Sequence, residues 1–216
     1  EVTVDHFCKD LDQLYILTAQ RSNSHISIID NTGRNNDPNF IDPMKNPEVE
    51  KYSYCISFKD DYIIVDDHRF QANVLVTDSF FLQLMDYPVI SGIKTIQRPD
   101  DAIITRKYAK HLFKDENPLG KQLVSSAGYT LTIRGIVDEP DTKSSLQFDL
   151  ITPGNQGKYM DWSRMGFCIT RLVKGTELAK FNEKISKPQS LICFSHSPIQ
   201  FRLFPLKELY FNKVVS

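Results

Sequence analysis

The chain has 216 residues, of which 41% are hydrophobic and 25% are charged, as in an ordinary globular protein. Its formal net charge of -1 and its pI near 6.6 give no electrostatic case for nucleic acid or an anionic membrane surface as a partner. No apolar run approaches the roughly 18 residues that a bilayer-spanning helix needs. No basic-then-apolar leader precedes Glu1 either. Because the chain starts at Glu1 without an initiator Met, we expect a mature or excised segment from which any membrane anchor was left out.

The first third of the chain predicts a short helix followed by strands. Apolar residues from Val4 to Leu11 recur at the i, i+3, i+4, i+7 spacing of one helix face, and charged residues fall off that face. Residues 34–47 are rich in Asn, Asp and Pro and predict a loop. Aromatic, aliphatic and β-branched runs predict strands, with Lys59-Asp60-Asp61 as a hairpin turn, at residues 14–19, 26–29, 52–58, 62–65 and 72–76.

The rest of the chain alternates between short helices and strands. Asp78 is a candidate N-cap for a helix over residues 79–85, and Thr105 is the candidate N-cap of a helix that ends at Phe113. A third helix is predicted at 176–185, and strands at 102–104, 122–124, 129–137, 167–173 and 199–203. The pattern predicts a mixed α+β fold, in which an antiparallel sheet is covered on one face and a compact block, residues 80–149, is inserted.

The sequence lacks the motifs of well-known catalytic sites. Gly120-Lys121 does not complete a phosphate-binding loop, because Asp115 stands at the position of its first glycine and Gln122 at that of its Ser/Thr. There is no Gly-x-Ser-x-Gly elbow, no His-Glu-x-x-His motif and no dinucleotide-type glycine cluster. We therefore name no catalytic, cofactor-binding or metal-binding residue, and we expect no cofactor.

Two groups of side chains allow a chemical interpretation, and for each a structural one is preferred. Adjacent strand residues point to opposite faces, which favours a solvated hairpin over a metal site for the densest set of potential ligands, Asp60, Asp61, Asp66, Asp67 and His68. The other histidines are predicted to lie on the surface or in the core. A Ser/His/Asp site assembled from distant residues stays open for them: His6, His25, His111 and His196.

Cysteine and aromatic side chains are expected mainly in the core. The four cysteines form no Cys-x-x-Cys pair, which argues against a zinc or thioredoxin-like site. Two disulfides are open to them in an oxidising compartment, but buried free thiols are preferred for Cys8, Cys55, Cys168 and Cys193. Aromatic residues on apolar faces are expected to pack rather than to form a stacking platform: Phe80, Phe81, Tyr108, Phe113, Tyr129 and Phe148.

Several short motifs follow one another in the central part of the chain. They are Asp78-Ser79-Phe80-Phe81, Val89-Ile90-Ser91-Gly92, Ala102-Ile103-Ile104-Thr105, Ala109-Lys110-His111-Leu112-Phe113, Asn117-Pro118-Leu119-Gly120-Lys121 and Ile133-Arg134-Gly135-Ile136-Val137. In this order they resemble the periplasmic core domain of MacB/FtsX-type ABC transporter permeases. Shorter similar segments are Val4-Asp5-His6-Phe7, Pro47-Glu48-Val49-Glu50 and Phe204-Pro205-Leu206-Lys207-Glu208-Leu209-Tyr210. Residues 34–46 depart from the family, which usually has a clearer helix there.

The resemblance implies a fold of two subdomains and a function without catalysis. Residues 1–79 and 150–216 would form a Porter-like α/β sandwich, and residues 80–149 an inserted Sabre-like, strand-rich subdomain. The chain would then be the periplasmic domain of an inner-membrane permease. It would transmit ATP-driven motion to extracytoplasmic substrates or partners, in export or in lipoprotein or peptide handling, and it would not be an enzyme.

The same resemblance implies the partners. The full-length permease would be membrane-anchored and would pair with a cytoplasmic ABC ATPase subunit, a second permease copy and a periplasmic or outer-membrane protein. The isolated domain is expected to be monomeric or weakly associating, and its cargo stays open. The alternative hypothesis is a secreted enzyme or free ligand-binding domain whose site is assembled from residues distant in sequence.

Overall fold

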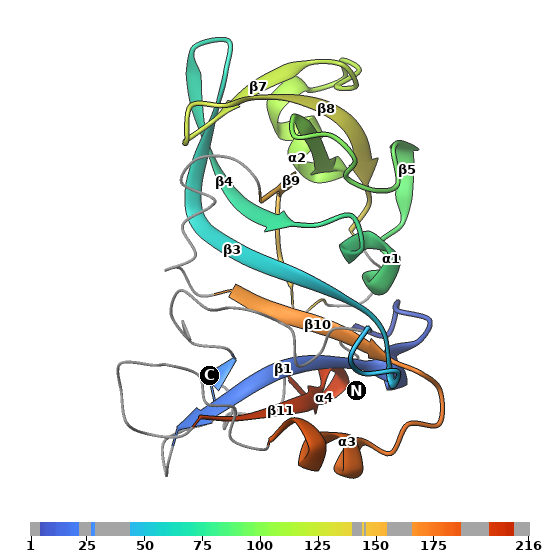
Figure 1. Cartoon of the computed structure of the whole chain (residues 1–216). Coiled ribbons are helices and arrows are strands. Elements are labelled where there is room, and N and C mark those ends of the chain that lie inside the picture. The colour runs from blue at the N-terminus through green and yellow to red at the C-terminus, as the bar shows by residue number, and fades with distance from the viewer. Residues whose placement is uncertain are drawn as a thin grey trace.

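The computed structural model describes residues 5–21, 27–28, 44–139, 144, 146–154, 166–186 and 199–209. Strands outnumber helices in these ranges, and eleven strands join in one continuous sheet (Figure 1). The predicted mixed α+β class is therefore confirmed. Across these ranges, no helix has both the length and the apolar character that crossing a membrane requires.

A four-stranded antiparallel layer of this eleven-stranded sheet forms the lower half of the molecule in Figure 1. From here on, "the sheet" means this four-stranded layer. Its order is β11 (Ile199–Pro205), β1 (Leu14–Arg21), β10 (Gly166–Leu172) and the first half of β3 (Val49–Val65), and β2 (Ser27–Ile28) also pairs with β1. One face of the sheet packs against α3 (Leu178–Ile185) through Phe181 and Ile185. The amphipathic pattern of residues 176–185 thus gives the predicted helix.

Six strands in the upper half pair in a closed circle, which we call the ring. The second half of β3 is followed around the ring by β4 (His68–Thr77), β9 (Leu150–Pro153), β6 (Asp101–Thr105), β8 (Thr130–Val137) and β7 (Gln122–Ser125). Because β7 pairs with both β8 and β3, the circle is complete. The helix α2 (Arg106–Phe113) adds Tyr108, Ala109 and Phe113 to the apolar cluster of the ring.

A second apolar core lies between the sheet and the ring, and we call this region the junction. Leu75, Ile103 and Ile151 contact it, whereas their strand neighbours belong to the ring cluster, since alternate residues of a strand face opposite sides. The helix α1 (Phe81–Met85) supplies four of its other buried residues, Phe81, Leu82, Leu84 and Met85, and α4 (Leu206–Leu209) supplies Leu206. Strands β6 and β9 are buried on both faces for this reason.

The strand β3 runs unbroken through both halves, which contradicts the predicted hairpin turn at residues 59–61. It has 17 residues, a length of roughly 55 Å at the usual rise per residue. Asp60 has a φ of 56° and sits in a register shift, so the polar stretch is a bulge and not a turn. The chain instead reverses at Asp66 and Asp67, whose φ values of 47° and 62° suit a tight hairpin turn.

Most other predicted elements are confirmed, with one clear exception near the start. Residues 5–10 form turns followed by the 3₁₀ helix η1 (Leu11–Gln13), because Asp5 has a left-handed φ of 58° that an α-helix does not allow. Three elements were not predicted from the sequence: β5 (Val89–Gly92), β9 and α4. The division into 1–79, 80–149 and 150–216 stays a prediction, and the ring includes two strands, β3 and β4, from the first stretch.

Candidate functional site at the junction of sheet and ring

The acidic stretch of the long hairpin ties strands together. Asp60 Oδ1 accepts a hydrogen bond from Gln71 Nε2 at 2.7 Å, and Asp61 Oδ2 accepts one from Ser126 Oγ at 2.8 Å. The His68 ring is bonded to a backbone carbonyl of the turn at 2.7 Å. Throughout the described ranges, no three His, Cys, Asp or Glu side chains are grouped so as to hold a metal ion.

The histidines that could be placed occupy different parts of the molecule. His6 is exposed in the turn before η1, and His111 lies on α2, where its ring centroid is 5.9 Å from that of Phe70. His25 and His196 lie outside the described residues. The described histidines therefore give no support to a shared catalytic site.

Three of the cysteines are buried free thiols, as predicted. Cys168 lies opposite Tyr54 in the β10–β3 ladder, so Cys55, the next residue of β3, points to the other face and cannot pair with it. Burial raises the pKa of Cys55 to about 12 and also raises the pKa values of Cys8 and Cys168 above the usual thiol range. Cys193 lies outside the described residues.

The segment Asn117-Pro118-Leu119-Gly120-Lys121 is a structural turn between α2 and β7. Gly120 has a φ of 83° and donates its N–H to the Ile133 carbonyl at 2.7 Å. The Lys121 ammonium group pairs with Glu116 and lies over the Phe113 ring, 4.6 Å from its centroid. The Lys121 side chain therefore contacts neighbouring side chains of the same turn and helix, as in a structural turn.

The aromatic residues predicted to pack do so with two exceptions. Phe81, Tyr108, Phe113 and Phe148 are buried. Phe80 and Tyr129 are 43% and 40% exposed, and for them the packing prediction is wrong. Phe80 immediately precedes α1 and contacts the ammonium group of Lys51, 5.2 Å from its ring centroid, while Tyr129 follows the β7–β8 turn. Both lie at ends of elements, where an apolar face is not continued.

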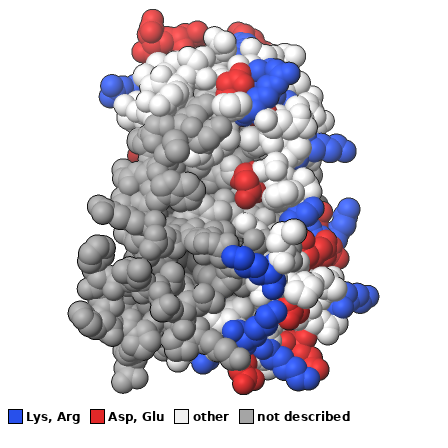
Figure 2. All heavy atoms as spheres, viewed as in Figure 1, with Lys and Arg blue, Asp and Glu red and all other residues white. Residues whose placement is uncertain are grey.

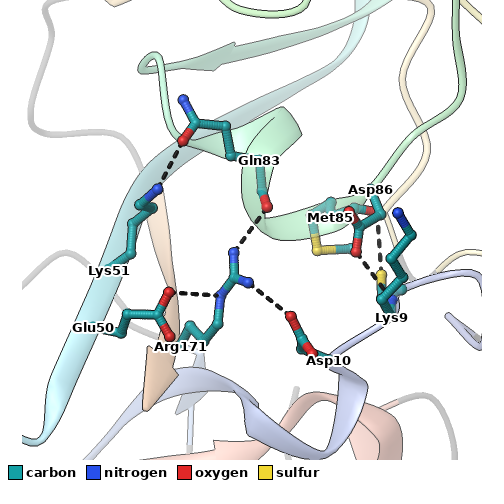
Figure 3. A network of polar contacts seen from close by, with 9 residues as sticks. Lys9, Asp10, Glu50, Lys51, Gln83, Met85, Asp86 and Arg171 are labelled. Atoms are coloured by element: carbon teal, nitrogen blue, oxygen red, sulfur yellow. Dashed lines mark hydrogen bonds and ion pairs between the residues drawn. The ribbon is translucent and has the colours of Figure 1, made fainter. Parts of the chain in front are cut away.

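The densest polar network of the junction centres on Arg171 of β10 (Figure 3). Its Nη2 donates to the Gln83 carbonyl of α1 at 2.8 Å, its Nη1 pairs with Asp10 at 2.9 Å, and its Nε lies 3.9 Å from Glu50 of β3. The Arg171 side chain is only 12% exposed. One guanidinium group thus links the turn before η1, the sheet and the C-terminal turn of α1, where a cation is favoured by the helix dipole.

The turn at residues 5–10 contacts the end of α1 directly. Cys8 Sγ donates to the Met85 carbonyl at 3.2 Å, and the Lys9 backbone N–H donates to Asp86 Oδ2 at 3.0 Å (Figure 3). Beside them, the rings of Phe7 and Tyr87 meet edge to face, with centroids 5.0 Å apart. These three contacts tie the turn to the segment that leads from α1 into β5.

Side-chain hydrogen bonds also stabilise β3 at the point where it leaves the sheet and enters the ring. The Tyr54 N–H donates to Asp78 Oδ2 at 3.1 Å, and the Tyr54 carbonyl accepts from Thr77 Oγ1 at 3.0 Å, so both backbone groups are satisfied after β4 has ended. Ser53 Oγ donates to Asp78 Oδ1 at 2.9 Å. Burial raises the pKa of Asp78, although hydrogen bonds from Phe80, Ser53 and Tyr54 partly oppose the shift.

The surface around this region carries charges of both signs. In Figure 2, blue and red side chains are interspersed over the described part of the visible face. Several are paired, among them Lys184 with Glu48 at 2.8 Å and Lys207 with Asp12 at 2.7 Å. Such a surface agrees with the near-neutral net charge.

Comparison with solved structures decides the fold. A domain of a candidate permease from Porphyromonas gingivalis superimposes with a TM-score of 0.72 and 16% identity, covering 92% of this chain and 91% of that one. The periplasmic region of MacB from Actinobacillus actinomycetemcomitans superimposes with a TM-score of 0.62 and 12% identity over 95% and 96% of the two chains. The chain has the fold of MacB-like periplasmic domains. The extracellular domain of the ABC-type transporter YknZ from Gram-positive bacteria shares the MacB-like fold, with a TM-score of 0.57 and 14% identity over 80% and 90%.

The MacB-like fold is shared despite low sequence identity. No protein-family model matches the chain, and no curated protein matches it. The short motifs that suggested the resemblance map onto turns, caps and strands of the ring, of β5 and of the junction, for example Thr105 Oγ1, which accepts from the Tyr108 N–H at 3.2 Å. Arg171 was not singled out in the sequence, although one basic residue within an otherwise apolar strand is a usable signal.

Proposed function

We propose that this chain is the extracytoplasmic domain of an ABC transporter permease of the MacB/FtsX type. The observation that carries the proposal is the near-complete superposition on the periplasmic region of MacB, in which more than nine-tenths of each chain is matched. Fold similarity alone does not establish a function. A match across the whole of an extracytoplasmic domain nevertheless favours that role over a free enzyme.

The arrangement of the first and last described elements supports an insertion between two neighbouring membrane segments. The early element η1 contacts α4, the last described helix, and Lys207 Nζ lies 2.7 Å from Asp12 Oδ1 across them. Strands β1 and β11 pair along their length, with Tyr15 opposite Pro205. These first and last described elements are therefore adjacent, as expected of a domain placed between two adjacent transmembrane helices.

The proposed role is to pass motion from the membrane to an extracytoplasmic substrate or partner. In this proposal the sheet with α3 and α4 corresponds to the Porter-like subdomain and stands next to the membrane helices. The ring corresponds to the Sabre-like subdomain and carries the substrate or partner contacts. The full-length protein would work with a cytoplasmic ATPase and a second permease copy, while this domain would perform no catalysis.

The test is the sequence and the location of the full-length protein. We expect one apolar helix just before Glu1, three after Ser216 and an ATPase gene beside the permease gene. Carbonate-washed membranes should retain the full-length protein, and protease added outside spheroplasts should cleave this domain. A cleavable signal peptide followed by a stop codon after Ser216 would overturn the proposal and favour the secreted enzyme or ligand-binding domain.

A further inference from the structure

The helix α1 is too short to hold its own position. It has five residues, and an isolated helix of that length is unstable in water. Its polar anchors point to the sheet and to the turn at residues 5–10: Arg171 and Cys8 bind its carbonyls, and Lys51 Nζ donates to Gln83 Oε1 at 2.7 Å. The position of α1 is therefore set by those partners together with the packing of its four buried side chains in the junction core.

The chain continues from α1 directly into β5, at the end of the strand order. The Asp138 N–H donates to the Pro88 carbonyl at 2.8 Å, and the Ile93 N–H donates to the Arg134 carbonyl at 2.8 Å, one at each end of β5. Between them the β5–β8 ladder is short and interrupted by a register shift near Ile90, which is 42% exposed. Within the described ranges β5 pairs with β8 alone, so it is the most easily displaced strand around the ring.

We propose that residues 81–92, from α1 through β5, form a relay that couples the position of the turn at residues 5–10 to the β5 edge of the ring. Displacement of the turn would pull on Met85 and Asp86 through the bonds from Cys8 and Lys9. The pull would pass through Tyr87 and loosen β5 from β8. The source of the displacement, a moving membrane helix before the turn, rests on the proposed function; the coupling itself does not.

Asp86 allows a clean test, because its backbone and its side chain can be separated. Its φ of 50° is left-handed, which glycine adopts without strain and asparagine tolerates. Asp86→Gly keeps the backbone but removes the acceptor for the Lys9 N–H, whereas Asp86→Asn keeps an oxygen there. Loss of a charge-assisted hydrogen bond should speed amide exchange about tenfold in Asp86→Gly. The effect should appear in residues 81–92 and at the Lys9 amide, and Asp86→Asn should stay close to wild type.

Hydrogen exchange measured residue by residue distinguishes a relay from general destabilisation. Strand β6 is the internal reference, since Ala102, Ile103 and Ile104 have no exposed surface and should report only global unfolding. Arg171→Met should also speed exchange in residues 81–92 by about tenfold, because it removes the contacts to Asp10 and Gln83. Lys184→Met, which breaks an ion pair on the far side of the sheet, is the matched control and should leave that segment unchanged.

Each outcome decides the relay separately from the proposed function. Faster exchange at Lys9 and in α1 without any change in β5 would overturn the coupling, as would equal acceleration in β6. Because the measurement uses the 216-residue chain alone, the relay can fail while the membrane location of the full-length protein is still found. Conversely, a secreted protein could retain the relay.

Discussion

The ring and the junction are held together by different means. The ring encloses an apolar cluster in which Ile63, Ala102 and Leu131 have no exposed surface, and its strands close on themselves. The junction combines an apolar core with a polar network around Arg171, most of whose bonds join segments far apart in sequence. Tight apolar packing resists small displacements, whereas a few polar bonds can break and re-form. The contrast suggests that the ring moves as one body and that adjustment takes place at the junction.

The largest expected effect is the removal of packing from the ring. Ile104→Ala takes three carbons from a fully buried side chain of β6, and we expect a loss of about 2–5 kcal/mol in the free energy of unfolding. Urea denaturation followed by circular dichroism measures it. Ile90→Ala on exposed β5 is the control, with an expected loss below about 0.5 kcal/mol. Equal losses at both positions would contradict the contrast between ring and edge.

A smaller effect is expected where β8 and the end of β5 approach closely. A Cβ atom at Gly135 would lie 2.7 Å from the Ile93 carbonyl oxygen, a backbone atom that cannot move away alone. Gly135→Ala should therefore destabilise by about 1–3 kcal/mol and displace the seam between β5 and β8. Gly154→Ala, whose Cβ would meet only Val76 Cγ1 at 3.2 Å, should cost less in the same urea titration.

Thiol labelling compares the two regions kinetically. Cys8 and Cys55 both face the junction core, Cys8 from the turn at residues 5–10 and Cys55 from β3, whereas Cys168 lies on the opposite face of the sheet. In a Cys193→Ser background, Cys8 should react with an alkylating reagent about tenfold faster than Cys168, because junction opening requires less free energy than opening the sheet. Peptide mass spectrometry after timed quenching measures the order. Simultaneous labelling of Cys8 and Cys168 would show that the junction opens only with global unfolding.

The smallest expected effects are in the pH dependence of stability, and they have opposite signs. The raised pKa of Asp78 gives stability that is fully present below its unfolded value of 3.8 and is lost as pH rises through the higher folded pKa. Hydrogen bonding to Arg134 lowers the pKa of Asp100, whose contribution is present above 3.8 and is lost as pH falls through the lower folded pKa.

Two single variants separate the pH-dependent stability contributions of these two carboxyl groups. Relative to wild type, the stability deficit of Asp78→Asn should grow between about pH 6.5 and about pH 4, and the deficit of Asp100→Asn should shrink between about pH 4 and about pH 3. Urea titrations at the three pH values measure both. If the stability deficits of the two variants changed with pH in the same direction, the predicted electrostatic difference between junction and ring would be contradicted.

Local patterns predicted local elements well. The Thr105 cap, the amphipathic face of residues 106–113 and the alternation in residues 130–137 all produced the expected helix and strands. Each depends on contacts within a few residues or on one hydrophobic period. The hairpin at residues 59–61 failed for the opposite reason. Two acidic residues with turn character were accommodated as a bulge, because pairing with β4 on both sides of it stabilises a continuous strand.

The junction could not be predicted from spacing. Arg171, Asp10 and Gln83 are brought together only by the order of strands in the sheet and the path of the chain into α1. The resemblance to MacB-type domains anticipated the fold, because its motifs mark caps and turns that the ring requires. It contained no information on which side chains bridge the two halves.

The pairing of β1 with β11 also has a consequence for how the chain folds. Tyr15 lies opposite Pro205, so β11, which is synthesised long after β1, must emerge before this ladder can form. Hairpins such as β3–β4 and β7–β8 close short loops and can form early, whereas a contact of such sequence separation is entropically slow. Until this ladder forms, the edge of β1 that β11 covers stays unpaired, a state prone to aggregation. A nascent chain of this protein therefore has reason to need a chaperone until its last strand emerges.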